Sequence, residues 1–247
     1  MKKIFLYILA GSLCFSACKK DDEVPSYQEP GDINVQNSYD DQAIKKFMDE
    51  NYLDAQGNIK AFSDTDTSDD KEKKLSQLDY KTLPSGTIYI MRDGAQPAPG
   101  EAQEIKDNSV IRIMGRAYAY QAIDNNGNIV FSAKTQFFNT IDDGTIPLAD
   151  PMFYYVKQAT LDAGATDAAK SRSYYEIAGL KEALKKFGAF NLPNEAPYNL
   201  QGVIIVPSRA AFARNAHYPY GSYSYRNKSF VFNFQIYGSR DRLKNEE

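Results

Sequence analysis

Few residues in this 247-residue chain could perform covalent or metal chemistry. It has one histidine, His217, and two cysteines, Cys14 and Cys18, which lie close to the N-terminus. A histidine without a carboxylate or nucleophile beside it in the sequence is usually a surface residue or one whose hydrogen bonds are satisfied. Because Cys14 falls in a predicted leader and Cys18 is predicted to be lipidated, we expect no disulfide, thiolate nucleophile or cysteine metal site.

The chain offers aromatic side chains instead, and they concentrate near its C-terminus. An apolar run at residues 202–206 ends at Pro207, and an alternating apolar pattern follows at residues 229–236. These two patterns predict strands of a half-buried sheet that frames an aromatic crevice. The loop between them is rich in Gly, Pro and Ser and carries four tyrosines, which is typical of an adaptable binding surface. The alternative is a solvated loop in which the tyrosines have no binding role. The four tyrosines are Tyr218, Tyr220, Tyr223 and Tyr225.

The N-terminus has the features of an exported lipoprotein. Lys2 and Lys3 precede a dozen apolar residues at 4–15, which are too few to span a membrane and predict a signal peptide over residues 1–17. The small residues before Cys18 resemble a bacterial lipobox, which implies a lipid anchor at Cys18. The charged cluster at residues 19–23 resembles the export signal of lipoproteins in Bacteroidetes-type bacteria, and its alternative is a solvated spacer. We therefore expect a protein anchored in the bacterial outer membrane, on the cell surface or on the periplasmic face.

Net charge indicates which partners are excluded, and local composition predicts how the rest of the chain is divided into segments. The net charge of −3 becomes more negative when Lys2 and Lys3 are removed, which argues against a nucleic-acid partner. Residues 18–39 are polar and show no regular spacing of apolar residues, so they predict a flexible tether. An apolar stripe that includes Ile44, Phe47 and Met48 predicts a helix over residues 40–60 that packs on the following domain.

Residues 61–82 predict a polar linker. Their acidic residues do not match a calcium-loop pattern, because Asp69 stands where the loop requires glycine. No metal site is therefore expected there.

The folded domain is predicted over residues 83–240. A turn-forming sequence at residues 124–127 predicts a hairpin, and an apolar face at 177–188 that ends at Gly188 predicts a helix. Between residues 137 and 175 lies a long insertion, with one strand predicted at 152–156.

Five segments of this domain resemble, in order, those of FK506-binding-protein (FKBP)-type peptidyl-prolyl cis-trans isomerases. The segments are residues 84–90, 107–113, 124–132, 177–188 and 202–236. The resemblance implies an α+β fold in which an antiparallel β-sheet wraps around one short helix, here preceded by a short N-terminal helix.

The resemblance also implies a set of pocket residues. Tyr118 or Tyr120 aligns near the tyrosine that forms a wall of the family's pocket. Ile177 matches the residue whose backbone N–H holds a substrate carbonyl. The family's pocket Asp, floor Trp and Tyr hydroxyl are replaced here by Ser132, Leu180 and Phe212. The residues that the resemblance assigns to catalysis are Tyr118, Phe131, Ile177, Leu180, Phe212 and Phe232.

Prolyl isomerisation needs no nucleophile, metal or cofactor. The barrier to rotation is roughly 18–20 kcal/mol, and an apolar pocket lowers it by binding the twisted amide better than the planar forms. Loss of the Tyr hydroxyl removes a hydrogen bond worth about 1 kcal/mol. The sequence thus predicts either a weak isomerase acting on proline-containing polypeptides of exported proteins or a catalytically silent module that binds peptides or a partner protein. A structural surface protein of unrelated fold is the third alternative.

Overall fold

The computed structural model describes residues 27–142 and 146–247. The predicted signal peptide and the lipidation site Cys18 lie outside these residues. Among the described residues, no helix has the length and apolar character needed to cross a membrane, and no cluster of His, Cys, Asp and Glu side chains is arranged to hold a metal ion.

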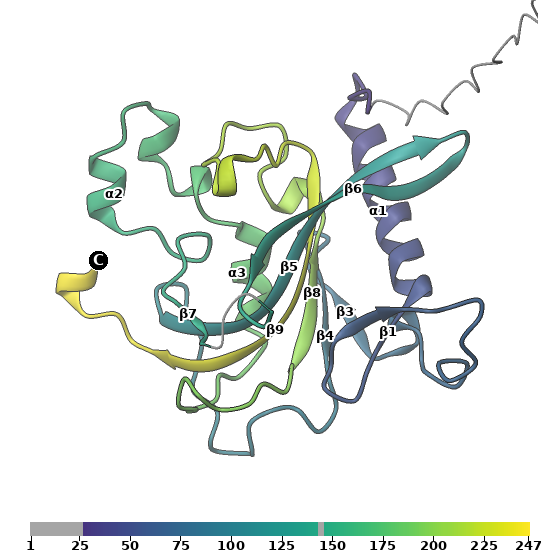
Figure 1. Cartoon of the computed structure of the whole chain (residues 1–247). Helices are drawn as coiled ribbons and strands as arrows, with labels where there is room; N and C mark the ends of the chain where they lie inside the picture. The colour runs from purple at the N-terminus through teal and green to yellow at the C-terminus, as the bar shows by residue number, and fades with distance from the viewer. Residues whose placement is uncertain (1–26, 143–145) are drawn as a thin grey trace, which may run out of the picture.

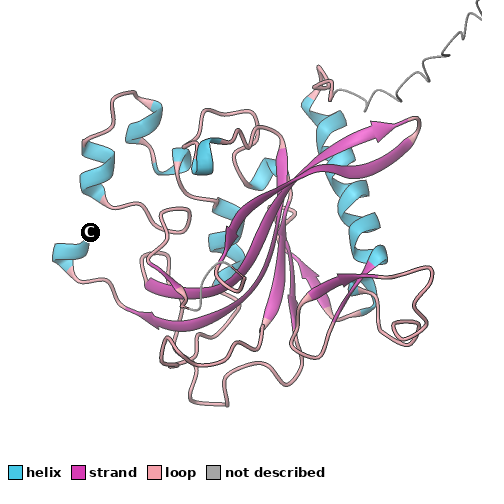
Figure 2. Cartoon of the chain, viewed as in Figure 1, coloured by secondary structure: helices cyan, strands magenta, loops and turns pink. Residues whose placement is uncertain are grey.

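The α+β fold class is confirmed (Figures 1 and 2). A seven-stranded sheet has the order β3-β4-β8-β9-β5-β6, with β7 paired to β5, and every pair is antiparallel. The strands are β3 (Tyr80–Thr82), β4 (Ile88–Met91), β5 (Val110–Asn125), β6 (Asn128–Asn139), β7 (Leu148–Ala149), β8 (Gly202–Val206) and β9 (Lys228–Arg240).

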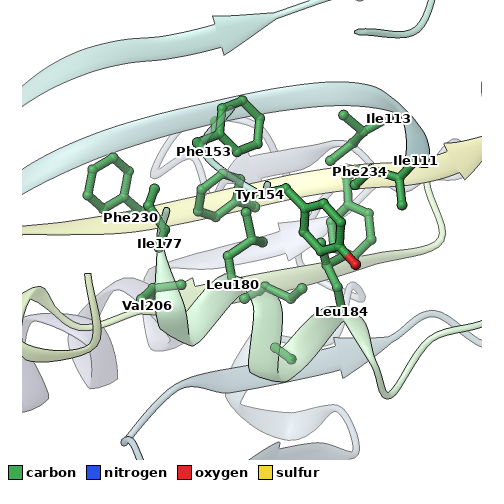
Figure 3. Close-up of a cluster of buried hydrophobic side chains, with 14 of the residues drawn as sticks. Ile111, Ile113, Phe153, Tyr154, Ile177, Leu180, Leu184, Val206, Phe230 and Phe234 are labelled. Atoms are coloured by element: carbon green, nitrogen blue, oxygen red, sulfur yellow. The ribbon is translucent and has the colours of Figure 1, made fainter. Parts of the chain in front are cut away.

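Helices cover both faces of the sheet. The short helix α3 (Ala178–Leu184) packs on one face and the long helix α1 (Ile33–Glu50) on the other (Figure 1). Strand β8 divides its side chains between these two cores, since Ile204 and Val206 face α3 whereas Val203 and Ile205 face α1. Burial on both faces explains why this strand reads as a continuous apolar run. The core on the α3 face is drawn in Figure 3.

The N-terminal helix differs from its predicted bounds of 40–60. It begins at Ile33, because the Asp32 side chain accepts a hydrogen bond from the Asn34 N–H and caps the helix. It ends at Glu50, and a small hairpin of β1 (Asn51–Leu53) and β2 (Ile59–Ala61) follows.

The predicted tether and the predicted polar linker both make contacts with the folded domain. In the predicted tether of residues 18–39, the Glu29 carboxylate accepts two hydrogen bonds from Arg226, at 2.7 and 2.8 Å. In the predicted linker of residues 61–82, Leu75 is fully buried against the α1 core and β3 pairs with β4. The polar composition of these segments gave no sign of this ordering. Each segment is held by a few specific contacts and has no repeating pattern of apolar residues.

The 137–175 insertion contains β7, α2 (Gln158–Asp162) and two short 3-10 turns. The strand predicted at residues 152–156 is absent. Phe153, Tyr154 and Val156 are buried there, but the backbone carbonyl of Phe153 accepts its hydrogen bond from the start of α3 and not from the sheet.

Candidate functional site

The register of β5 decides which residues face α3. Ala117 pairs with Phe232 and Ala119 with Phe230, and all four side chains belong to the core on the α3 face. Successive residues of a strand point to opposite faces, so Tyr118 faces α1. Tyr120 does the same. The prediction that either tyrosine forms the crevice wall is therefore wrong, and two alanines occupy that position.

Phe131 also lies on the α1 face. Its ring centroid is 5.0 Å from that of Tyr120 and 5.9 Å from that of Phe47. The six predicted catalytic residues thus divide between the two faces of the sheet, and Tyr118 and Phe131 cannot share a crevice with the others.

The other four predicted residues do come together on the α3 face. Ile177, Leu180 and Phe232 are fully buried, and Phe212 is 1% exposed. All four belong to one hydrophobic cluster, in which Figure 3 shows Ile177 and Leu180 pointing from α3 toward the strands. Side chains with so little exposure serve as core and offer no open surface to a substrate.

Aromatic rings fill the space above this cluster. The Phe137 ring centroid lies 5.1 Å from Phe153, 5.2 Å from Tyr220 and 5.0 Å from Phe230. Phe153 is itself 6.2 Å from Phe232. The sequence did not reveal the roles of Phe137, at the start of the insertion, and Phe153, within it, because the resemblance lapses over these residues.

The backbone N–H of Ile177 is already bonded. It donates to the carbonyl of Phe153 at 2.8 Å, so the group expected to hold a substrate carbonyl is occupied within the chain. A substrate could use this N–H only if the segment that carries Phe153 moved away.

The four tyrosines of the 215–225 loop have different environments. Tyr218 and Tyr223 are exposed, at 38% and 54%. Tyr220 is half-buried and its hydroxyl donates to the Tyr175 carbonyl at 2.8 Å. Tyr225 is buried and its hydroxyl donates to the Tyr220 carbonyl; burial raises the pKa of Tyr225 to about 12. Tyr225 therefore supports the loop from within, and it does not present a binding surface.

His217 holds the same loop in place. Its ring stacks on Phe212 with centroids 4.8 Å apart, and its Nε2 accepts a hydrogen bond from the Tyr225 N–H at 2.8 Å. The histidine is thus satisfied by local contacts, as its isolation in the sequence indicates.

A continuous row of rings leads from the insertion to the crevice. Successive centroids are 4.9 Å apart for Tyr174 and Tyr175, 5.5 Å for Tyr175 and Tyr218, 4.9 Å for Tyr218 and Tyr220, and 5.2 Å for Tyr220 and Phe137. We call these five residues the ring row.

One end of the ring row lines a groove of about 550 Å³. Small residues of the insertion, including Ala159, Ala163 and Gly164, form its other side. In the described part of the chain, the hydroxyls of Tyr174 and Tyr218 have no hydrogen-bond partner, so both could donate to a ligand's carbonyl groups.

No protein-family profile and no curated protein matches this chain. Among solved structures, it is similar to FkpA from Escherichia coli, with a TM-score of 0.35 and 19% identity over 66% of this chain and 52% of that one. The match thus spans about half the length of FkpA. It is also similar to a peptidyl-prolyl cis-trans isomerase from Pseudomonas syringae pv. tomato, with a TM-score of 0.41 and 11% identity over 87% of this chain and 100% of that one.

Proposed function

We propose that this chain is an FKBP-like lipoprotein of the bacterial outer membrane that binds proline-containing segments of exported proteins, with little or no isomerase activity. The order of its five FKBP-like segments supports the family assignment, and an antiparallel sheet packed on a short helix is the fold that this assignment requires. Cys18 carries the lipid in this proposal.

The ring row is the observation that favours binding. Proline-containing segments adopt extended conformations that dock into grooves lined by aromatic side chains, where unpaired hydroxyls bond the peptide carbonyls. Tyr218 is exposed and half-buried Tyr174 lines the same groove, so a peptide lying there would contact both rings.

Two observations disfavour efficient catalysis. The Ile177 N–H is bonded to Phe153, and the rings of Phe137 and Phe153 occupy the space over Phe232. A twisted amide needs a pocket in which it is bound better than a planar one, and a filled crevice cannot provide that preference.

The binding site is tested by substituting tyrosines of one loop. A Pro-rich peptide and its Pro-to-Ala counterpart are titrated against the wild type, Tyr218→Ala and Tyr223→Ala by isothermal calorimetry. Truncating a tyrosine at a binding hot spot costs about 1–2 kcal/mol, so Tyr218→Ala should weaken the Pro-rich peptide about five- to thirtyfold. Tyr223 is more exposed but does not line the groove, so Tyr223→Ala should bind as the wild type does. Equal losses in both variants would refute the groove as the site.

A weak isomerase is the second candidate. It is favoured by the lack of sheet pairing in the segment that carries Phe153, because displacing this segment would free the Ile177 N–H. A protease-coupled assay of prolyl-peptide turnover tests it. Acceleration in proportion to protein concentration would favour the isomerase over the silent binding module.

Membrane anchoring needs its own test. Metabolic labelling with a fatty acid should mark the wild type and leave Cys18→Ser unlabelled. If labelled protein is absent from the outer-membrane fraction, the proposed localisation is wrong; protease treatment of intact cells distinguishes the surface from the periplasmic face.

A further inference from the structure

A second cavity lies on the face of the sheet away from α3. Its volume is about 170 Å³, and it is lined by α1, by the β1–β2 hairpin and by strands β5, β6 and β9. Tyr118 and Tyr120 line it from β5, Phe47 from α1, and Ile59 and Ala61 from β2. The ring row and the α3 core contribute no residue to it, so this cavity is separate from the proposed peptide groove.

The cavity has room for a single aromatic ring. A cavity of about 150 Å³ lined by apolar side chains accommodates benzene. Here the Phe47 and Tyr120 rings meet at 5.7 Å with an interplanar angle of 54°, which leaves ring faces and edges for a guest ring to contact. A planar six-membered ring fits this volume.

The charged groups of the cavity leave one positive charge uncompensated. The Arg116 guanidinium donates to both carboxylate oxygens of Asp142, at 2.8 and 2.7 Å, and is therefore neutralised. Lys134 lies with its Nζ 4.0 Å from the centroid of the Tyr118 ring and forms no ion pair with any described carboxylate. A ligand with a single negative charge would match this balance.

Three of the free hydrogen-bonding groups of the cavity can donate, namely the Lys134 ammonium and two tyrosine hydroxyls. The amide nitrogens of Asn51 and Asn233 are bonded to backbone carbonyls. By contrast, the Tyr118 and Tyr120 hydroxyls have no hydrogen-bond partner in residues 27–142 and 146–247. Two hydroxyl donors and an ammonium favour a ligand that accepts hydrogen bonds, such as a carboxylate.

We propose that this cavity binds a small aromatic monocarboxylate. Its ring occupies the space between Phe47 and the two β5 tyrosines, and its carboxylate meets the Lys134 ammonium. The ring provides shape selectivity and the lysine provides charge selectivity.

Benzoate, benzamide and acetate serve as probes in calorimetric titrations of the purified protein. Benzoate should bind saturably, and about three- to fivefold more tightly than uncharged benzamide, because an exposed ion pair contributes only modestly. Acetate lacks the ring and should show no saturation. Absence of saturable benzoate binding up to about 10 mM, the weakest affinity expected for so few atoms, would overturn the proposal.

Three variants locate the binding. Lys134→Met should weaken benzoate about three- to fivefold and leave benzamide unchanged, whereas Lys170→Met, at an exposed position outside the cavity, should change neither. Ala61→Phe fills the cavity from an exposed position and should abolish binding of both rings, with an unchanged circular dichroism spectrum. Benzoate binding that survives Ala61→Phe, or equal effects of the two lysine variants, would place the ligand elsewhere and refute the proposal.

Discussion

A buried carboxylate, Asp40, connects α1 to the turn that follows β8. One of its oxygens accepts the Ser208 N–H and the other the Gln36 side-chain amide, each at 2.9 Å. All three residues are 0% exposed, so Asp40→Ala would leave two buried donors without partners. Each orphaned donor costs roughly 1–3 kcal/mol, and we expect a loss of about 2–5 kcal/mol in the free energy of unfolding.

Asp41→Ala is the matched control. Asp41 follows directly in the same helix, but its side chain is 58% exposed and pairs with Arg209 at the surface, 2.7 Å away. A pair of this kind contributes about 0.2–1 kcal/mol. Both variants replace aspartate by alanine within α1, so the change in helix propensity cancels in the comparison.

The assay is urea unfolding followed by circular dichroism at several pH values. Burial raises the pKa of Asp40 above its ordinary value. The unfolded chain therefore releases this proton first, and the stabilising contribution of Asp40 is complete below pH 3.8 and falls as the pH rises through the higher pKa of the folded state. The difference between the wild type and Asp40→Ala should thus be larger near pH 4 than near pH 7. A loss no greater than that of Asp41→Ala would refute this explanation of how α1 is held.

Two further predictions concern other contacts. Gly179→Ala places a methyl group 2.4 Å from the Thr87 hydroxyl oxygen and 2.7 Å from a Val206 methyl carbon. The resulting overpacking beneath α3 should lower the free energy of unfolding by about 1–3 kcal/mol in the same assay. An unchanged stability would contradict this packing. Hydrogen bonds from Arg116 lower the pKa of Asp142 to about 2. In a carboxyl NMR titration, Arg116→Met should raise this pKa toward the ordinary aspartate value, and an unshifted midpoint would contradict the pairing.

Much of the fold could be predicted from local patterns. The hairpin turn at Asp124–Gly127 and the apolar face of α3 depend on short-range chemistry, and the structure has both. The start of α1 could not be found in this way, because its first turns carry polar residues and their only local signal is the Asp32 cap.

The candidate site was harder to predict because of strand register. Tyr118 and Tyr120 alternate with Ala117 and Ala119, and α1 buries the face that a half-exposed sheet would leave open. Aromatic residues are then expected on both faces, so residue type alone does not reveal which set lines the crevice. Phe153 was missed for a different reason, because its place depends on a contact with Ile177 that is distant in sequence.

The most direct test of binding without catalysis is a single NMR experiment. A labelled peptide whose proline populates both cis and trans forms is mixed with a substoichiometric amount of protein, and chemical shifts and exchange cross-peaks are recorded together. Uncatalysed exchange takes tens to hundreds of seconds, which is too slow for such cross-peaks to appear. We predict shifts that grow with protein concentration in the absence of exchange cross-peaks. Strong cross-peaks that require the protein would show that the Ile177 N–H and the ring-filled crevice do open to substrate, and would contradict the proposal of a binding module.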